Sequence, residues 1–305
     1  MSAVDVSWRV LVLGCGSAGR RWIELARELG LSVYAYDIDP KVRAETKELG
    51  ATPVPDIAAG IRRNPHGAII ATWPRDHIEL ALRMVRANIH CLIEKPLSHT
   101  TDGVEDLVRE CAGRPHLAAG VVCNLRYHPT TTALRKTLDE GRLGRLVSLR
   151  LECGSDLKAW RKQPYAEGYG PWISRGGGVS LDAIHELDLA CHLLGQPESA
   201  VGLTHRTGEL TGDSEDVASF VLRHRAGISE VHLDYLQATY FRRATVIGNR
   251  GRADLSYEAD PKAWRGTYLA NLKAWMNAAS GAPMPNPVHE AAATLRVALL
   301  ARSAA

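Results

Sequence analysis

The first 123 residues alternate short apolar, β-branched runs with longer stretches whose apolar positions recur every three or four residues. The short runs predict buried strands and the recurring positions predict amphipathic helices. Strict alternation of the two predicts a parallel sheet covered on both faces, and therefore an α/β fold. Strands are expected at 9–13, 32–36, 68–72, 89–93 and 117–123, and helices at 17–29, 76–87 and 102–111.

The pattern changes after residue 123, where several segments alternate apolar and polar residues one by one. Such alternation predicts an antiparallel sheet with one solvent-facing side. Two domains are therefore expected, residues 1–123 and 124–287, with a last helix at 288–305 as a candidate to pack back on the first domain. In the second half we expect strands at 146–153, 200–206, 217–223, 228–236, 244–247 and 253–257, and helices at 130–140, 181–194, 267–279 and 290–301.

Composition narrows the class of protein. The chain has 305 residues, a formal net charge of +3 and no long block of Lys and Arg, which argues against nucleic acid or an anionic membrane as the main partner. No apolar run approaches the roughly 18 residues of a membrane span, and the N-terminal segment lacks the basic start of a signal peptide. The six scattered cysteines form no CxxC pair, which indicates reduced thiols. A soluble, cytoplasmic protein is expected.

A GxGxxG pattern directly follows the first predicted strand and opens the first predicted helix. In this context the first glycine permits a tight turn, the second lets the backbone approach a pyrophosphate, and the third lets helix and strand pack closely. The helix N-terminus adds free N–H groups for the anion. The loop therefore predicts dinucleotide contacts at Gly14, Cys15, Gly16, Ser17, Ala18 and Gly19.

Asp37 stands at the end of the second predicted strand, 18 residues after Gly19. A carboxylate there accepts hydrogen bonds from the adenosine ribose and repels a 2′-phosphate, which favours NAD over NADP. Asp39 is the alternative ribose ligand, but it precedes Pro40 and is expected to cap the next helix. Arg43 is the nearby cation that would weaken the preference for NAD.

Glu94-Lys95-Pro96 follows another strand of the predicted parallel sheet. Ligands of such sheets collect at the carboxyl ends of the strands, so Lys95 is placed to face the cofactor. A lysine beside nicotinamide can donate a hydrogen bond or a proton to a carbonyl oxygen during hydride transfer. An ordinary surface lysine is the alternative interpretation.

Taken together, these motifs resemble the glucose–fructose oxidoreductase / inositol dehydrogenase family, Gfo/Idh/MocA. The resemblance covers nearly the whole chain. The matching segments are GCGSAGRR at 14–21, ATWPRDH at 71–77, CLIEKPLS at 91–98, VVCNLRYHP at 121–129, GGGVSLDAIHELD at 176–188 and HLDYLQ at 232–237.

The resemblance implies an N-terminal Rossmann domain and a C-terminal α+β domain with a large, mostly antiparallel sheet that forms a homodimer or homotetramer. It implies an NAD(P)-dependent dehydrogenase or reductase that acts on a CH–OH group of a sugar, nucleotide sugar or cyclitol. A non-catalytic NAD-sensing protein is one alternative. An NAD-assisted lyase or glycosidase with no net redox change is another.

The resemblance also assigns residues. Lys95 corresponds to the family's central acid or hydrogen-bond donor, and Glu94 helps to orient it. The segment that runs along the cofactor corresponds to Thr72, Trp73, Pro74 and His77, with Trp73 as a departure from the family pattern. The segment that lines nicotinamide and substrate corresponds to Asn124, Arg126 and Tyr127.

Asp182, His185 and Asp188 lie on the predicted helix after a glycine run, with Asp182 and His185 on one face. An imidazole titrates near neutral pH, so His185 suits proton transfer from a substrate hydroxyl, unless it is simply a packed core histidine. Asp182 is expected to orient His185 or to contact the substrate. Asp188 is expected to cap or brace the helix.

The loop at 156–175 is rich in aromatic and basic residues, among them Trp160, Arg161 and Arg175. It is either a solvated loop or a lid that stacks on a sugar and supplies cations for a phosphate or carboxylate. In the second case Trp160 and Arg161 contact the substrate. The chain has no HExxH motif and no paired cysteines, so no metal site is predicted.

Overall fold

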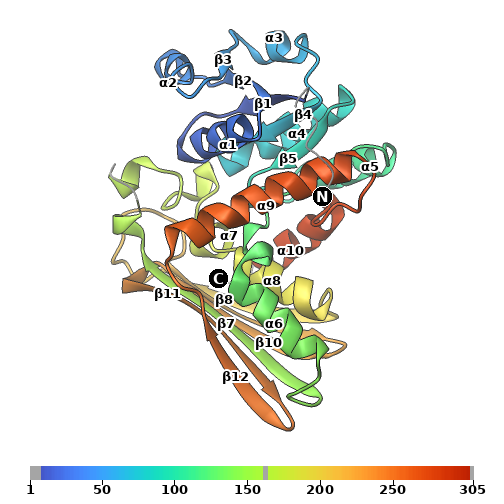
Figure 1. The fold of residues 1–305 in the computed structure, drawn as a ribbon. Helices are drawn as coiled ribbons and strands as arrows, with labels where there is room; N and C mark the ends of the chain where they lie inside the picture. Colours follow the sequence, from blue (N-terminus) through green and yellow to red (C-terminus); the bar gives the residue numbers. More distant parts are fainter. Residues whose placement is uncertain (1–7, 161–163, 303–305) are drawn as a thin grey trace. The chain divides into compact units, whose positions relative to one another are not determined.

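The chain forms two compact units, each built from two separate stretches of sequence (Figure 1). The computed structural model describes residues 8–160 and 164–302. The first unit comprises Met1–Val122 and Leu269–Ala291, and the second comprises Cys123–Tyr268 and Ala292–Ala305. The C-terminal stretch that belongs to the first unit thus lies earlier in the chain than the 288–305 expected from sequence.

The first unit contains a six-stranded parallel sheet in the order β3-β2-β1-β4-β5-β6, which confirms the expected Rossmann-type fold. The strand order reverses between β1 and β4, and ligands of such sheets bind at this reversal. The strands are β1 (Arg9–Leu13), β2 (Ser32–Tyr36), β3 (Thr52–Pro53), β4 (Gly67–Ile70), β5 (His90–Ile93) and β6 (Ala119–Val121).

Five helices connect these strands, and α1, α4 and α5 bury apolar residues, whereas α2 has no buried residue. In α1 the buried residues include Trp22, Ile23 and Leu25, at the spacing that predicted the helix. The carboxylate of Asp39 accepts a hydrogen bond from the Lys41 N–H and so caps α2, as expected. The helices are α1 (Ser17–Glu28), α2 (Pro40–Glu45), α3 (Ile57–Ile61), α4 (His77–Arg86) and α5 (Val104–Ala112).

Residues from the C-terminal part of the chain complete the first unit at β6. Gly120 forms an antiparallel bridge with Pro287, and the Val121 N–H donates to the carbonyl oxygen of Asn286 at 3.0 Å. Trp275 is fully buried and donates its indole N–H to the carbonyl oxygen of Ala118 at 3.1 Å. The edge strand of this sheet is therefore paired and covered by segments far away in sequence.

The second unit contains a six-stranded sheet in the order β12-β11-β7-β10-β9-β8, in which only β7 and β10 run parallel. The mostly antiparallel sheet confirms the expectation. β11 is longer than the predicted strand, and its register against β7 shifts between Leu236 and Phe241, where the apolar alternation fails. The strands are β7 (Leu146–Asp156), β8 (Ser199–His205), β9 (Val217–His224), β10 (Gly227–Asp234), β11 (Leu236–Gly248) and β12 (Gly251–Ser256).

The helix predicted at 181–194 is interrupted, because Ala183 (φ −98°, ψ 31°) leaves the helical region. It forms two helices, α7 (Val179–Asp182) and α8 (His185–Leu194), so Asp182 ends one and His185 begins the next. The remaining helices are α6 (Pro129–Asp139), α9 (Pro261–Ala279) and α10 (Val288–Leu300). In the portion of the chain described, none of the helices has the length and apolar character that crossing a membrane requires.

Candidate functional site

The three glycines of the loop after β1 have different surroundings. Gly14 has a left-handed backbone (φ 85°), and a Cβ there would stand 2.7 Å from the backbone of Ala71. A Cβ at Gly19 would stand only 1.9 Å from the carbonyl oxygen of Gly14. At Gly16, by contrast, a Cβ would meet no described atom within 4 Å. Turn and packing therefore require Gly14 and Gly19, whereas Gly16 borders open space where a pyrophosphate can approach.

The start of α1 adds hydrogen-bond donors to this loop. Gly16 is the N-cap residue, and within the described residues no side chain caps the helix. The first N–H groups of a helix have no partner inside the helix, so an anion can accept their hydrogen bonds. The residues of the loop thus fit a dinucleotide phosphate.

Asp37 immediately follows β2 and is fixed to the glycine loop. Its carboxylate accepts hydrogen bonds from the Cys15 N–H at 2.7 Å and the Asp39 N–H at 2.9 Å. Arg43 lies beside it, donates to the carbonyl oxygen of Asp37 at 3.1 Å and stacks on the Tyr36 ring. The carboxylate expected to favour NAD and the cation expected to weaken that preference are therefore both at the end of β2.

Lys95 follows β5, and the side chain of its neighbour fixes its backbone. Glu94 is buried, with one carboxylate oxygen accepting from the Trp22 indole N–H at 2.8 Å and the other from the Lys95 N–H at 3.1 Å. The Lys95–Pro96 peptide bond is cis. Since α1 supplies Trp22, the helix that opens at the glycine loop also holds the segment that carries Lys95.

His77 joins the loops after β4 and β5. Its ring is fully buried, with Nδ1 2.8 Å from the carbonyl oxygen of Pro96 and Nε2 3.2 Å from that of Thr72. Burial lowers the pKa of His77, which favours the neutral ring. The buried ring thus connects the two loops, and the expected contact of His77 with the cofactor stays a prediction.

The turn between β4 and α4 contains the other predicted cofactor residues of this segment. Thr72 and Trp73 are partly exposed, whereas Pro74 is buried. The guanidinium of Arg75 lies over the Trp73 ring, 5.1 Å from its centroid. Thr72 and Trp73 thus present surface that a ligand can touch.

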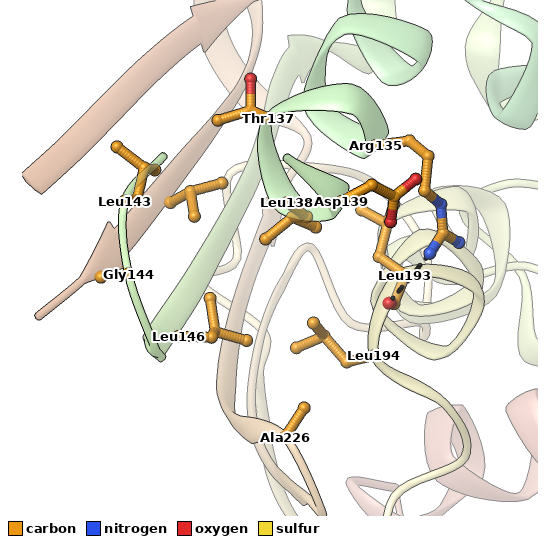
Figure 2. Close-up of a pocket in the computed structure, with 12 residues that line it drawn as sticks. Arg135, Thr137, Leu138, Asp139, Leu143, Gly144, Leu146, Leu193, Leu194 and Ala226 are labelled. Atoms are coloured by element: carbon orange, nitrogen blue, oxygen red, sulfur yellow. Dashed lines mark hydrogen bonds between the residues drawn. The ribbon is translucent and has the colours of Figure 1, made fainter. Parts of the chain in front are cut away.

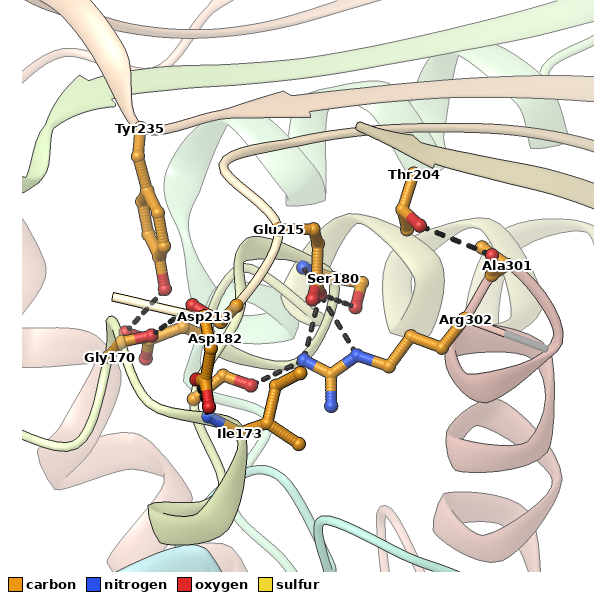
Figure 3. A network of polar contacts seen from close by, with 12 residues as sticks. Gly170, Ile173, Ser180, Asp182, Thr204, Asp213, Glu215, Tyr235, Ala301 and Arg302 are labelled. Carbon is orange, nitrogen blue, oxygen red and sulfur yellow. Dashed lines mark hydrogen bonds and ion pairs between the residues drawn. The ribbon is translucent and has the colours of Figure 1, made fainter. Parts of the chain in front are cut away.

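In the second unit, two phenol groups hold Asp182. Its carboxylate accepts from the Tyr169 hydroxyl at 2.7 Å. It also accepts from the Tyr235 hydroxyl at 3.1 Å (Figure 3). Burial, and then the charge of Asp182, raise the pKa of Tyr235 well above its ordinary value, so this phenol remains a donor. Sequence reasoning did not predict that either tyrosine contacts Asp182, although Tyr169 lies in the 156–175 loop and Tyr235 inside the HLDYLQ segment.

His185 is 8% exposed and begins α8, whose first turn is held from two sides by buried ion pairs. The carboxylate of Asp188 pairs with both Nη2 (2.6 Å) and Nε (2.9 Å) of Arg126, and Glu186 pairs with Arg242 at 2.6 Å. Asp188 braces the helix, as expected. The Arg126 guanidinium, 6% exposed, is directed at Asp188, and its expected contact with the substrate stays a prediction.

Asn124 and Tyr127 lie on a 3-10 turn, η2 (Asn124–Tyr127), before α6. The Asn124 amide donates to the Thr267 hydroxyl at 2.9 Å. Its oxygen and the Tyr127 hydroxyl are buried and accept or donate no hydrogen bond within residues 8–160 and 164–302. Because a buried polar atom without a partner is costly, both atoms are candidates for contact with a bound ligand.

In the described part of the loop at 156–175, some side chains pack against the protein and others are exposed. Trp160, 40% exposed, donates its indole N–H to the Ser155 hydroxyl at 2.9 Å and meets the Tyr235 ring edge-on. Arg175 donates to the carbonyl oxygens of Glu167 and Gly168, so its cation stabilises the loop itself. Arg161 lies outside the described residues.

A cavity of about 200 Å³ opens elsewhere in the second unit, between α6, α8 and the sheet (Figure 2). Arg135 at its edge donates to the carbonyl oxygens of His192 and Leu193 at the end of α8. None of the predicted site residues that the structure describes lines this cavity. Over the same residues, His, Cys, Asp and Glu side chains form no group of three or more that could hold a metal ion.

Comparisons with known proteins identify relatives by sequence. Inositol 2-dehydrogenase 2 of Saccharopolyspora erythraea is 28% identical over 233 residues, which are 71% of this chain and 63% of that protein. The chain spans less than two thirds of the length of that protein and of two other curated relatives that it matches.

Solved structures show the same fold. GenD2 from gentamicin A biosynthesis, in complex with NAD, has a TM-score of 0.87 at 18% identity, over 99% of this chain and 95% of that one. The WlbA dehydrogenase of Bordetella pertussis, in complex with NADH and UDP-GlcNAcA, has a TM-score of 0.83 at 20% identity, over 98% of both chains.

Two family models match separate parts of the sequence and together cover most of it. Residues 8–119 match the oxidoreductase family with an NAD-binding Rossmann fold, and residues 131–254 match the GFO/IDH/MocA C-terminal domain. Both models describe the same group of proteins, in the same order along the chain. The protein therefore belongs to the Gfo/Idh/MocA oxidoreductase family.

Proposed function

We propose that this protein is an NAD-dependent dehydrogenase or reductase acting on a secondary alcohol or ketone of a sugar, nucleotide sugar or cyclitol. The observation that carries the proposal is the glycine loop at the β1/β4 reversal, with open space beside Gly16 and Asp37 fixed at its edge. Family membership and a relative named as an inositol dehydrogenase support the substrate class.

The glycine loop, Asp37, Thr72 and Trp73 would hold NAD, which when bound supplies or accepts a hydride. In the oxidation direction His185 takes the proton from the substrate hydroxyl, the C–H bond breaks with its electron pair and the carbonyl forms. The Lys95 ammonium donates a hydrogen bond to the same oxygen, and in the reduction the proton returns to that oxygen from His185. His77 and Glu94 position the segments that carry Thr72 and Lys95.

Asp182 would orient His185 or a substrate hydroxyl, and its two phenol donors keep the carboxylate in one place. Asn124, Tyr127, Trp160 and Arg161 are the further substrate contacts that we propose. The buried amide oxygen of Asn124 and the buried hydroxyl of Tyr127 support this assignment, because a hydroxyl-rich ligand would satisfy them.

The proposed preference for NAD over NADP rests on Asp37, whose carboxylate repels a 2′-phosphate. Steady-state kinetics with both cofactors test it directly. We expect a higher kcat/KM with NAD. A kcat/KM with NADP that equals or exceeds it would show that Arg43 outweighs Asp37.

We further propose that the protein is a homodimer or homotetramer that associates through the second sheet. Val201, Leu203, Val221 and Ile228 expose apolar side chains on β8, β9 and β10, with Val201 69% exposed. Light scattering after size exclusion measures the oligomeric state, and a monomer would contradict the proposal. A cytoplasmic location remains a prediction from the unpaired cysteines of the sequence.

Replacement of Lys95 tests the activity. Absorbance of reduced nicotinamide is followed with a panel of sugars, nucleotide sugars and cyclitols for the wild type, Lys95→Ala and His185→Gln. The surface variant Lys41→Ala is the matched control. We expect Lys95→Ala to abolish turnover while NADH binding, measured by fluorescence, stays near the wild-type value.

Three outcomes of this experiment would contradict the proposal. Retention of most of kcat in Lys95→Ala would remove Lys95 from the mechanism. Binding of NADH without turnover of any substrate in the wild type would indicate an NAD-sensing protein. Substrate conversion without added NAD and without accumulation of NADH would indicate a lyase or glycosidase with no net redox change.

A further inference from the structure

A buried ion pair holds the segment that carries Asp182. The Arg302 guanidinium, which follows α10, donates to Oε1 of Glu215 from Nε at 3.1 Å and from Nη2 at 2.8 Å (Figure 3). The Arg302 and Glu215 side chains are 16% and 7% exposed. Pairs this well excluded from water are sensitive to the loss of one partner, because the other charge is then left buried.

Glu215 caps α7 from outside the helix. Its carbonyl oxygen accepts from the Val179 N–H at 3.1 Å, and its Oε1 accepts from both the N–H and the hydroxyl of Ser180. The residue at the N-cap position is Gly178, which has no side-chain oxygen to offer. The first N–H groups of α7 therefore depend on Glu215 for acceptors that a capping serine or aspartate normally provides.

The glycine run at 176–178 makes room for this arrangement. Gly178 has a positive φ of 110°, and a Cβ there would overlap Nη2 of Arg302 and the carboxylate of Glu215. A Cβ at Gly177 would overlap the carbonyl oxygens of Tyr169 and Gly170, and the Gly177 carbonyl oxygen itself accepts from Arg302. The absence of side chains here thus allows close packing rather than free motion.

A direct path leads from this packing to Asp182. The Asp182 N–H donates to the carbonyl oxygen of Gly178 at 2.9 Å, so the four-residue helix transmits a shift of Gly178 to the carboxylate. Gly178 also donates to the carbonyl oxygen of Gly170 at 2.8 Å, next to Tyr169, one of the two phenol donors to Asp182. The ion pair therefore affects both the carboxylate and one of its donors.

We propose that Arg302 and Glu215 are positioning residues that fix Asp182 in its working geometry through Gly178 and α7. They act without touching substrate or cofactor. This inference rests on the proposed function, since it gives the position of Asp182 a catalytic purpose. It predicts a loss in kcat with little change in the affinity for NADH, because misplaced groups of the reacting centre lower the rate of the chemical step.

The test compares Arg302→Ala, Arg302→Lys, Glu215→Gln and the Ala/Gln double variant with Thr204→Val. The Thr204 hydroxyl donates to the carbonyl oxygen of Ala301 at 3.2 Å, so this control removes another contact of the same C-terminal segment but keeps the ion pair. For each protein kcat, KM for the substrate, Kd for NADH and amide hydrogen exchange across 176–188 are measured.

We expect each single loss of charge to lower kcat by about tenfold or more, with no further loss in the double variant. Arg302→Lys should keep part of the activity, since one charged nitrogen can still donate to the Glu215 carboxylate. NADH affinity should stay within about twofold of the wild type, and exchange at 178–182 should accelerate. Thr204→Val should match the wild type in every measurement.

A kcat within about twofold of the wild type in both Arg302→Ala and Glu215→Gln overturns the proposal. So does an equal loss in Thr204→Val, which would indicate a general effect of the C-terminal segment. If Arg302→Ala does not fold, the same limits on kcat, NADH affinity and amide exchange are applied to Arg302→Lys and Ser180→Ala. If the wild type converts no substrate, the proposed function has failed, and unchanged exchange at 178–182 in the variants would separately refute the positioning by Arg302 and Glu215.

Discussion

One added methyl group is expected to have different effects at two glycines of the same loop: a loss of stability at Gly19 and a loss of NADH affinity at Gly16. In Gly19→Ala the new Cβ would stand 1.9 Å from the Gly14 carbonyl oxygen, so helix and loop must move apart. Overpacking typically costs about 1–3 kcal/mol, and a backbone neighbour cannot rotate away, so we expect roughly 3 kcal/mol. For a domain of roughly 150 residues this lowers the thermal midpoint by about 6–12 °C.

In Gly16→Ala the methyl group enters open space, and the backbone (φ −66°, ψ −163°) suits alanine. The weaker N-cap preference of alanine costs less than about 1 kcal/mol, so the fold should remain stable. The methyl group stands, however, where the pyrophosphate is expected to approach. We expect Kd for NADH to rise by about tenfold or more, which corresponds to about 1.4 kcal/mol.

Circular dichroism melts and NADH fluorescence titrations separate the two effects. Gly113→Ala is the matched control, because its Cβ would meet only ordinary contacts outside the loop, 3.6 Å from the nearest atom. Wild-type affinity for NADH in Gly16→Ala would refute the assignment of this space to the cofactor. A wild-type melting temperature in Gly19→Ala would refute the packing argument.

Three further outcomes are expected. Asp37→Ala should raise the ratio of kcat/KM with NADP to that with NAD by about tenfold or more, and an unchanged ratio in steady-state kinetics would contradict the role of the carboxylate. Burial and two nearby arginines lower the pKa of His192 to about 4, so the folded state favours the neutral ring and loses stability as the pH falls from about 6.5 towards 4. Melts over this range should show a smaller loss for His192→Gln than for the wild type. Tyr235→Phe leaves the buried Asp182 with one phenol donor, so unfolding in urea should show a loss of about 1.5–3 kcal/mol together with a lower kcat.

The elements that the sequence predicts best are those with local causes. The strand at 9–13 forms as expected, because a strand buried on both faces appears as a continuous apolar run. The strand at 32–36 also forms as expected, with its buried residues at alternate positions. The glycine loop also has a local cause. Three glycines within six consecutive residues account for the tight turn, the approach of an anion and the close packing of helix and strand. The break at Ala183 is less visible, because α7 and α8 share one helical pattern.

The contacts of site residues that the sequence does not reveal depend on partners far along the chain. Arg126 has the chemistry of a ligand-binding residue, but Asp188, 62 residues away, occupies its guanidinium. Nothing in the local pattern identifies that partner. Likewise, the sequence does not indicate that the His77 ring meets the carbonyl oxygens on two loops, or that Tyr169 and Tyr235 converge on Asp182.

The pairing of β6 with Asn286 and Pro287 sets an order for biosynthesis. A ribosome that adds about 5–20 residues per second needs roughly 10–30 s to pass from Val121 to Asn286, which are 165 residues apart. During that interval the growing chain carries β6 as an unpaired sheet edge, and such edges invite association with other chains. The nucleotide-binding part of the protein is therefore finished only when most of the second unit has been made. An expression fragment that ends at residue 122 would keep this edge open, whereas one that also supplies 269–291 would close it.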